Sequence, residues 1–558
     1  MNDLEKLLNA EDKEQQRQGL LELLNLLAEV QAENERLQAE NQALRDEINR
    51  LKGEQGKPKI GGGKGEGGNR DYSSERERRQ VRGRRKGSKV KGLAIDRVEV
   101  LRLARTALPV DAEFKGYQRV VVQDIRLERD NIVFQREKYY AASTGRAYIA
   151  ALPGGYGGQF GPGVKALALI LYYLGQMTQP RIKMFLASVG CQISAGQVSQ
   201  LLVKRQEKFH REKNAVYEAG LRSSPWQHID ETVMYEAKET HYTHIVCNSL
   251  YTSYHTLPRK DRLSVLDVLR NRQPRQYRLN GQALQIMNTL GLSQKTQQQM
   301  SRLPRDHDFN EDEFTSLLES HQLKLGPQQR RWILSAAAVA AYHSQKEWPV
   351  VKLLICDEAG QYKAITEKWA ACWVHDGRHY KKLITPVPLF QQEVDEFLDA
   401  YWQFYHHLVA FREYPSHYQA DYLRQEFDTL FARQYRYRAL NKRIGHSRAR
   451  KHTLLQILNH PEILPHNNPA ELAARQRVRK RKISYGTQGT DGTQAWDTFL
   501  SLMDTTRKLG VSFYRYIFDR IQDTYDIPPL AQLVTQQAAH RQFDASWTNG
   551  IPDLPASY

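Results

Sequence analysis

Two adjacent carboxylates, Asp230 and Glu231, stand in the middle of the stretch PWQHIDETVMY, residues 225–235. The β-branched and aromatic residues around them, with a proline before the run, predict a β-strand. Neighbouring side chains of a strand point to opposite faces, so we expect Asp230 to face a site and Glu231 to face away. A carboxylate in an apolar strand is costly unless it is paired or binds a metal. A salt bridge at the strand end is the simpler interpretation of an isolated aspartate.

Two further acids follow at positions that regular structure can bring beside Asp230. The apolar run VVKLLIC ends at Asp357, which is the pattern of a strand buried on both faces with an acid at its C-terminal end. In the later stretch LPHNNPAELAAR, Asn468 is expected to cap a helix and Pro469 to occupy its first position. Glu471 then lies in the first helical turn.

Three carboxylates that converge on one place have a definite chemical use. They bind two Mg²⁺ or Mn²⁺ ions, because hard cations prefer oxygen ligands. Two such ions, roughly 4 Å apart, activate a water or a 3′-hydroxyl and stabilise the leaving oxygen at a phosphodiester. The candidate catalytic and metal-binding residues are therefore Asp230, Asp357 and Glu471, with two Mg²⁺ or Mn²⁺ ions as the cofactor.

The order of these blocks resembles the DDE transposases of the Insertion-Sequence-66 type. HIDET resembles the block of the family's first catalytic aspartate, CDEAGQY that of the second, and NNPAELAAR the block that carries the catalytic glutamate. The segment WAACWVHDGRHYKKL resembles the family's Cys-Trp-Ala-His-x-x-Arg segment, which places on that pattern Cys372, Trp373, His375 and Arg378. The resemblance covers roughly residues 150–525.

This resemblance implies a DNA transposase that performs metal-dependent strand cleavage and strand transfer of an insertion sequence. The implied fold is α/β: a ribonuclease-H-like mixed sheet flanked by helices, with helical insertions, a helical DNA-binding region and an N-terminal coiled coil. The implied partners are DNA, at the element ends and at the target, a second copy of the chain, and helper proteins of the same element.

Two other classes of function stay open. One is a catalytically inactive, transposase-derived DNA-binding protein, which is favoured by Leu472, because the family has an arginine directly after the glutamate. The other is a coiled-coil scaffold that binds nucleic acid through a basic linker alone. The second alternative leaves the three acidic blocks unexplained.

Composition supports a polyanionic partner. The formal net charge is +18 and the pI is about 9.5. No apolar run of about 18 residues predicts a membrane span, and the polar, acidic N-terminus argues against a signal peptide. The four cysteines are scattered and form no Cys-x-x-Cys pair, which favours a reducing cytosol and argues against structural zinc. We therefore expect a cytoplasmic, nucleoid-associated bacterial protein.

A heptad pattern runs through residues 17–52 and predicts a parallel coiled-coil dimer. The a positions are Leu20, Leu27, Asn34, Asn41 and Ile48. The d positions are Leu23, Val30, Leu37, Leu44 and Leu51. Asparagine at an a position favours one register in a dimer. The alternative is one amphipathic helix packed on its own chain.

The remaining boundaries follow from shifts in composition and periodicity. We expect a coiled-coil helix over 1–52, a basic glycine-rich linker over 53–92, a small β-rich domain over 93–151 with a turn at Arg-Asp-Asn, a helix-turn-helix-like region over 152–222, a catalytic core over 223–482 with helical insertions near 259–348 and 386–460, and a helical C-terminal region over 483–558.

Candidate DNA contacts lie in three places. The third helix of the helix-turn-helix-like region, expected near 195–208, offers Gln197, Gln200 and Lys204. The resemblance adds His375 and Arg378. The run after the glutamate offers Arg475, Arg477, Arg479, Lys480, Arg481 and Lys482. The simpler interpretations are an ordinary helical hairpin and a solvated charged face.

Overall fold

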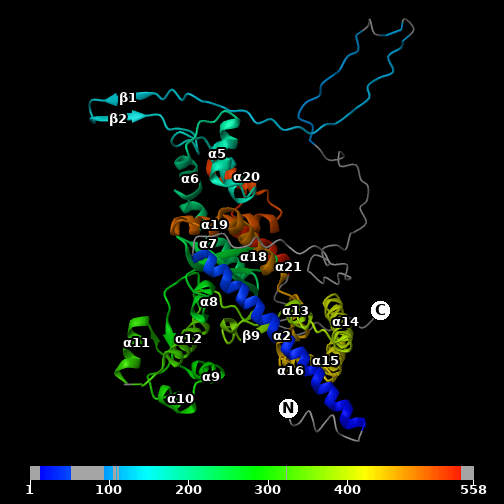
Figure 1. The fold of residues 1–558 in the computed structure, drawn as a ribbon. Helices are drawn as coiled ribbons and strands as arrows, with labels where there is room; N and C mark the ends of the chain where they lie inside the picture. Colours follow the sequence, from blue (N-terminus) through cyan, green and yellow to red (C-terminus); the bar gives the residue numbers. More distant parts are fainter. Residues whose placement is uncertain (1–12, 52–93, 105–107, 110–111, 322, 542–558) are drawn as a thin grey trace.

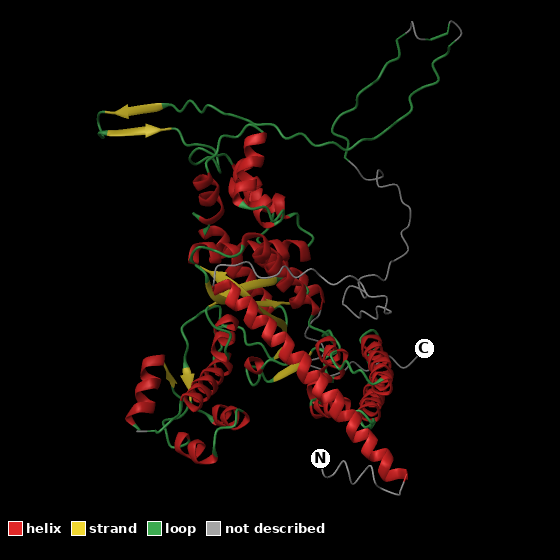
Figure 2. Ribbon diagram, in the orientation of Figure 1, coloured by secondary structure: helices red, strands yellow, loops and turns green. Residues whose placement is uncertain are grey.

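The computed structural model describes residues 13–51, 94–104, 108–109, 112–321 and 323–541. The expected linker over 53–92 lies outside the described residues. A central sheet surrounded by helices forms the body of the molecule, two helical lobes extend from it, and a long arm projects from the opposite end (Figures 1 and 2). Among the described helices, none combines the length and the apolar character that crossing a membrane requires.

The central sheet has five strands in the order β5-β4-β3-β8-β9. Strands β3 (Trp226–Glu236), β4 (Glu239–Cys247) and β5 (Thr252–Leu257) form an antiparallel meander. Strands β8 (Leu353–Cys356) and β9 (Lys368–Ala371) run parallel to β3. All four residues of β8 are buried, as expected of a parallel strand covered on both faces. The mixed α/β class expected from the sequence is therefore correct.

Two long helices from the C-terminal part of the chain pack on the sheet. Helix α18 (Asn468–Ser484) packs on β3 and β4, and α19 (Thr490–Lys508) packs on β5. Helices α20 (Phe513–Gln522) and α21 (Leu530–Arg541) follow. They contact α4 (Pro162–Tyr173) and α7 (Glu207–Arg222), respectively, which precede the sheet in sequence. Helices that precede the strands in sequence therefore pack against helices that follow them.

The chain between β5 and β8 forms the first helical lobe, at the lower left of Figure 1. Its elements are α8 (Arg262–Leu269), β6 (Tyr277–Arg278), α9 (Gly281–Thr289), α10 (Gln294–Met300), β7 (Asp308–Phe309), α11 (Glu311–Ser320) and α12 (Pro327–Ser344). Alanine-rich α12 is buried along its second half and returns the chain to β8.

The second lobe follows α13 (Trp373–Lys381), which comes directly after β9. Its elements are α14 (Pro388–Phe411), α15 (His417–Phe431), α16 (Arg438–Ala449), α17 (Lys451–Leu454) and the 3₁₀ turn η3 (Gln456–Leu458). Trp373 is fully buried and its ring lies within 5.3 Å of the rings of Tyr401 and Phe404. The segment that resembles the family's Cys-Trp block therefore anchors this lobe to the core.

The N-terminal helix α2 (Lys13–Leu51) has one face packed on the second lobe and another exposed to solvent. One face, with Leu21, Leu24 and Ala28, packs on the second lobe. Between them Asn25 accepts a hydrogen bond from the Arg438 amide at 3.0 Å and donates one to a carbonyl of the same loop. The heptad positions with strongly exposed side chains are Leu20, Leu27, Val30, Leu37, Leu44 and Ile48. The helix thus packs on its own chain and still presents the expected coiled-coil seam, whose pairing stays a prediction.

The helix-turn-helix-like region contains four helices: α4 (Pro162–Tyr173), α5 (Gln179–Ser188), α6 (Ala195–Val203) and α7 (Glu207–Arg222). The third helix ends at Val203 and does not reach residue 208 as the sequence suggested. Arg205 adopts a left-handed conformation with φ +60°, and this break starts a separate helix.

In the described part of the expected β-rich domain over 93–151, the regular structure is one short hairpin. Strands β1 (Lys138–Ala141) and β2 (Arg146–Ile149) join through a turn in which Gly145 takes φ +64°. The turn expected at Arg-Asp-Asn, residues 129–131, is wrong, since the described residues from 94 to 137 form no regular strand. The alternating pattern is present, but the segment lies in an exposed arm with no layer to bury its apolar face.

Candidate metal-binding and DNA-contact site

Asp230 lies on β3, and Asp357 directly follows the end of the neighbouring parallel strand β8. His228 of β3 pairs with Ile355 of β8, and the same register counted two residues further would match Asp230 with Asp357. Parallel neighbours are about 4.8 Å apart and side chains at matched positions share a face. The Asp357 carboxylate accepts the Ala359 amide at 3.0 Å, which turns the chain at the end of the strand.

Glu471 is brought to these two acids by the start of α18, which Asn467 caps and fixes. The expected cap Asn468 is instead the first residue of the helix and Pro469 the second, so the predicted start is wrong by one residue. The Asn467 amide group donates to the Ile229 carbonyl at 2.7 Å, one residue before Asp230, and its oxygen lies 3.1 Å from Nδ1 of His228. The backbone amide of Asn467 donates to the Cys372 sulfur at 3.2 Å. Sequence reasoning gave neither Asn467 nor Cys372 this role, because their partners are remote in the chain.

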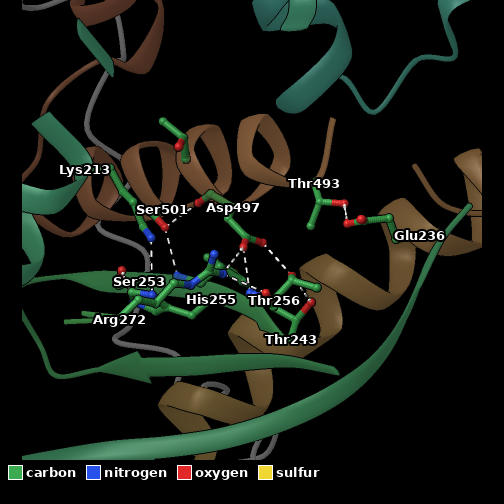
Figure 3. A network of polar contacts seen from close by, with 12 residues as sticks. Lys213, Glu236, Thr243, Ser253, His255, Thr256, Arg272, Thr493, Asp497 and Ser501 are labelled. Atoms are coloured by element: carbon green, nitrogen blue, oxygen red, sulfur yellow. Dashed lines mark hydrogen bonds and ion pairs between the residues drawn. The ribbon is translucent and has the colours of Figure 1, made fainter. Parts of the chain in front are cut away.

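Arg477 fixes the same helix on the sheet and on α19. It donates to Thr243 at 3.1 Å, Thr256 at 2.9 Å and Asp497 at 3.1 Å, and its side chain is fully buried. Figure 3 shows Asp497 of α19 facing Thr256 and Thr243 of the sheet. Asp497 also accepts the Thr256 amide at 2.7 Å. This network sets how α18 sits over the sheet, and it removes Arg477 from the candidate DNA contacts.

Electrostatics link the three acids across the chain. Burial, together with the nearby carboxylates of Glu471 and Asp357, raises the pKa of Asp230 to about 7. Burial also lowers the pKa of His228 to about 3, so this imidazole is neutral beside the cluster. The charges of Glu471 and Asp357 therefore both reach Asp230.

Arg378 of α13 supplies a cation to this cluster. Its Nη2 donates to Oε2 of Glu471 at 2.9 Å and its Nη1 to Oε1 at 3.4 Å. Burial by itself lowers the pKa of Arg378, but the hydrogen-bonded carboxylate of Glu471 reverses this and raises it overall. The expected DNA contact thus instead holds the third acid of the site.

The donor set fits a hard divalent cation, since all three side chains offer carboxylate oxygens. As the side chains stand, no three histidine, cysteine, aspartate or glutamate residues in the described part of the chain are grouped closely enough to hold one metal ion. Because Arg378 takes both oxygens of Glu471, a metal-loaded form requires that carboxylate to be shared or released.

Glu231 has partners of its own. Its Oε1 lies 3.1 Å from the Lys260 ammonium, and its Oε2 lies 4.0 Å from His244, the residue opposite it on β4. Burial raises the pKa of Glu231, and Lys260 partly opposes this effect. These contacts differ from those of Asp230, as strand alternation predicts.

The basic run of α18 divides by burial. Arg475, Arg479 and Lys482 are exposed, and their spacing of four and three residues places them on one helical face. They remain candidate DNA contacts.

Two other members of the run are turned inward. Lys480 is buried, donates to the Tyr172 carbonyl at 2.8 Å and lies 3.2 Å above the Tyr172 ring. Burial, with the charge of Arg477, lowers the pKa of Lys480 to about 7. Arg481 is half-buried and donates to the Val233 carbonyl. Lys480 is thus not available to DNA, because α18 packs on the body through more than one face.

The other expected DNA contacts have mixed surroundings. Gln197 closes the start of α6, accepting the Ser194 amide at 2.9 Å, and its amide group donates to Gln159 at 2.6 Å. Lys204 lies beyond the end of α6 in an ion pair with an aspartate of α19. Gln200 is exposed, and His375 is half-buried with its ring 5.1 Å from that of His379.

The fold and the acidic cluster together define an α/β protein with a candidate site for phosphodiester chemistry. The family model described as Transposase IS66 family matches residues 336–495, a stretch that includes Asp357 and Glu471. The chain is also 30% identical over 325 residues to the Uncharacterized protein y4jO of Sinorhizobium fredii (strain NBRC 101917 / NGR234), an alignment that covers 57% of this chain and 99% of that protein. The chain belongs to the IS66 transposase family.

Proposed function

We propose that this protein is a DNA transposase that performs metal-dependent strand cleavage and strand transfer of an insertion sequence. One arrangement carries the proposal: the β3–β8 register and the bond from Asn467 to the Ile229 carbonyl bring three acids that are remote in sequence toward one another, and the charges of Asp357 and Glu471 act on Asp230. The first two acids are 357 − 230 = 127 residues apart and the last two 471 − 357 = 114. Carboxylates that are brought together from remote parts of a chain, with a raised pKa, are typical of functional sites.

The proposed core is ribonuclease-H-like. Its support is the strand order β5-β4-β3-β8-β9, in which an antiparallel meander is extended by two parallel strands. The first acid stands on β3, where the antiparallel and parallel parts meet, and the second directly follows the neighbouring parallel strand β8. The third acid comes from a helix that packs on the same central strand.

Asp230, Asp357 and Glu471 would hold two Mg²⁺ or Mn²⁺ ions, which supply activation of an attacking water or 3′-hydroxyl and neutralise charge at the phosphate. The chain's own residues orient this set. Asn467 ties the helix of Glu471 to the strand of Asp230, and Arg477 fixes the same helix on the sheet.

The proposed partner is DNA. The exposed face of Arg475, Arg479 and Lys482 lies on the helix that carries Glu471, so these cations are suited to hold a strand across the site. The net charge of +18 supports the same partner. A bacterial cytoplasmic, nucleoid-associated location, with helper proteins of the same element, belongs to this proposal.

A cleavage assay on DNA carrying the element's own ends tests the proposal. We expect nicking and strand transfer by the full chain with Mg²⁺ or Mn²⁺, and neither reaction in a chelator. DNA binding without cleavage under all metal conditions would contradict the proposal and favour a catalytically inactive, transposase-derived DNA-binding protein.

A further inference from the structure

Arg378 occupies an unusual place, because its guanidinium contacts a carboxylate of the acidic cluster. It is half-exposed, so water reaches it, yet it makes two hydrogen bonds to one carboxylate. The charge of Asp230 also acts on it. An arginine that only solubilised the surface would gain little from that geometry, since exposed ion pairs contribute little stability.

The partner of Arg378 is the acid that a metal ion needs. Both oxygens of Glu471 receive an N–H from the guanidinium, at 2.9 and 3.4 Å. A metal ion requires lone pairs of the same oxygens. A planar guanidinium satisfies a carboxylate in a bidentate manner, so the two ligands compete for one group.

We propose that Arg378 is an internal counter-cation of the metal-free site, which incoming divalent cations displace from Glu471. The inference rests on the proposed metal site and adds a device to it. Without metal, the guanidinium offsets the repulsion among the three carboxylates and keeps Glu471 in place. When metal binds, Glu471 is released to it, and the freed guanidinium faces the site, where a DNA phosphate offers the same bidentate geometry as a carboxylate.

Competition and a purely structural role predict opposite changes in metal affinity when Arg378 is removed. If Arg378 competes with metal, its removal tightens metal binding. If Arg378 merely holds Glu471 in a metal-ready position, its removal weakens metal binding. The two roles therefore predict opposite changes in one measured constant.

The experiment titrates the full chain with Mn²⁺ alone, without DNA, and follows binding by calorimetry and by the magnetic resonance signal of free Mn²⁺. We expect Arg378→Met to bind Mn²⁺ about tenfold more tightly than the natural chain, a change in line with the loss of one charge-assisted hydrogen-bonded pair. Arg378→Lys keeps the charge but loses the bidentate fork, so its affinity should fall between the two.

Lys260→Met is the matched control. It removes one positive charge that is paired, at 3.1 Å, to the carboxylate of Glu231, the chain neighbour of Asp230. A general field effect would tighten Mn²⁺ binding equally in both variants, and this would overturn the inference. We expect the control to stay within about twofold of the natural chain, as expected for a half-exposed pair.

A double variant tests whether Arg378 acts on metal binding through Glu471. In Glu471→Gln the carboxylate is gone, so adding Arg378→Met should yield no further gain in Mn²⁺ affinity. Equal or weaker Mn²⁺ binding by Arg378→Met, in a chain whose circular dichroism is unchanged, would overturn the inference and leave the proposed metal site standing. Absence of saturable Mn²⁺ binding in every variant would overturn both.

Discussion

The pKa of Asp230 is raised by two effects. One is burial, and the other is the charge of the acids at the start of α18 and at the end of β8. Its backbone position is ordinary strand, so the perturbation comes wholly from what surrounds it. The same reasoning at the level of single residues separates Asp230 from Glu231, which is paired with Lys260. Two predictions belong to this scale.

The first concerns the three acids. Asp230→Asn, Asp357→Asn and Glu471→Gln should each keep the fold and DNA binding but lose cleavage by several orders of magnitude, because each removes one negative charge from a site that must hold about four positive charges. Circular dichroism, a DNA-binding titration and the cleavage assay check this. Glu231→Gln is the control and should be much milder. Equal losses in Glu231→Gln and Asp230→Asn would contradict the assignment of the strand's faces, and full activity in Glu471→Gln would remove the third ligand.

The second concerns Lys480, whose pKa burial lowers to about 7. Between pH 7 and its ordinary value of 10.5, the folded chain binds fewer protons at this side chain than the unfolded chain does, so burying Lys480 destabilises the fold near pH 7 and this penalty disappears as the pH rises. Lys480→Met should therefore be more stable than the natural chain at pH 7, by about 1 kcal/mol, and the difference should shrink toward pH 10.

Denaturant unfolding at several pH values measures this difference. Lys482→Met, two residues further on and exposed, is the control and should change the free energy of unfolding by less than about 0.5 kcal/mol at any pH. A stability difference for Lys480→Met that does not vary with pH would refute the assigned titration.

At the scale of elements, α18 joins the two parts of the proposed chemistry. Its first turn carries Glu471, its inward faces hold Arg477 and Lys480, and its outer face carries three exposed cations. A rotation of this helix would displace both the acid and the basic face. The buried network around Asp497 therefore supports function by holding one helix still (Figure 3).

The outer face of α18 yields the third prediction. Replacing Arg475, Arg479 and Lys482 together by alanine should weaken DNA binding at all sequences alike and make the logarithmic salt dependence less steep by about three, since each phosphate contact releases about 0.9 counterion. Binding isotherms at several salt concentrations measure the slope. The control replaces Lys295, Arg302 and Arg305, three exposed cations of the first lobe. An identical loss in both triple variants would show that only net charge matters.

At the scale of the whole molecule, α2 packs on the second lobe and exposes its heptad side chains, which we predict to pair with α2 of a second chain. Asn25 and the apolar residues near it hold the helix to the lobe, so two chains joined by their seams would carry their cores in a defined relation. A dimer of this kind presents two acidic sites, which matches the two ends of a mobile DNA segment in the proposed function.

The fourth prediction follows. Leu37→Asp with Leu44→Asp should convert a dimer into a monomer, because both side chains are exposed in the single chain and lie at d positions of the seam. Sedimentation of the full chain measures this. Ala32→Asp with Ala39→Asp adds the same charge on the opposite side of the helix and should leave the dimer intact. A natural chain that sediments as a monomer, or equal effects of both pairs, would end the coiled-coil interpretation.

The sequence by itself determined the mixed α/β class and the strands and helix in which, or next to which, the three predicted acids lie. Those signals are local: an apolar run before Asp357, a helix start before Glu471, alternation around Asp230. Tertiary structure alone decided which cations are free. Arg477 and Lys480 are buried and Arg378 is bound to Glu471, while Arg475 and Lys482 reach solvent. The physical reason is that exposure depends on packing partners such as Asp497, Tyr172 and the strands, which lie from 20 to 308 residues away along the chain.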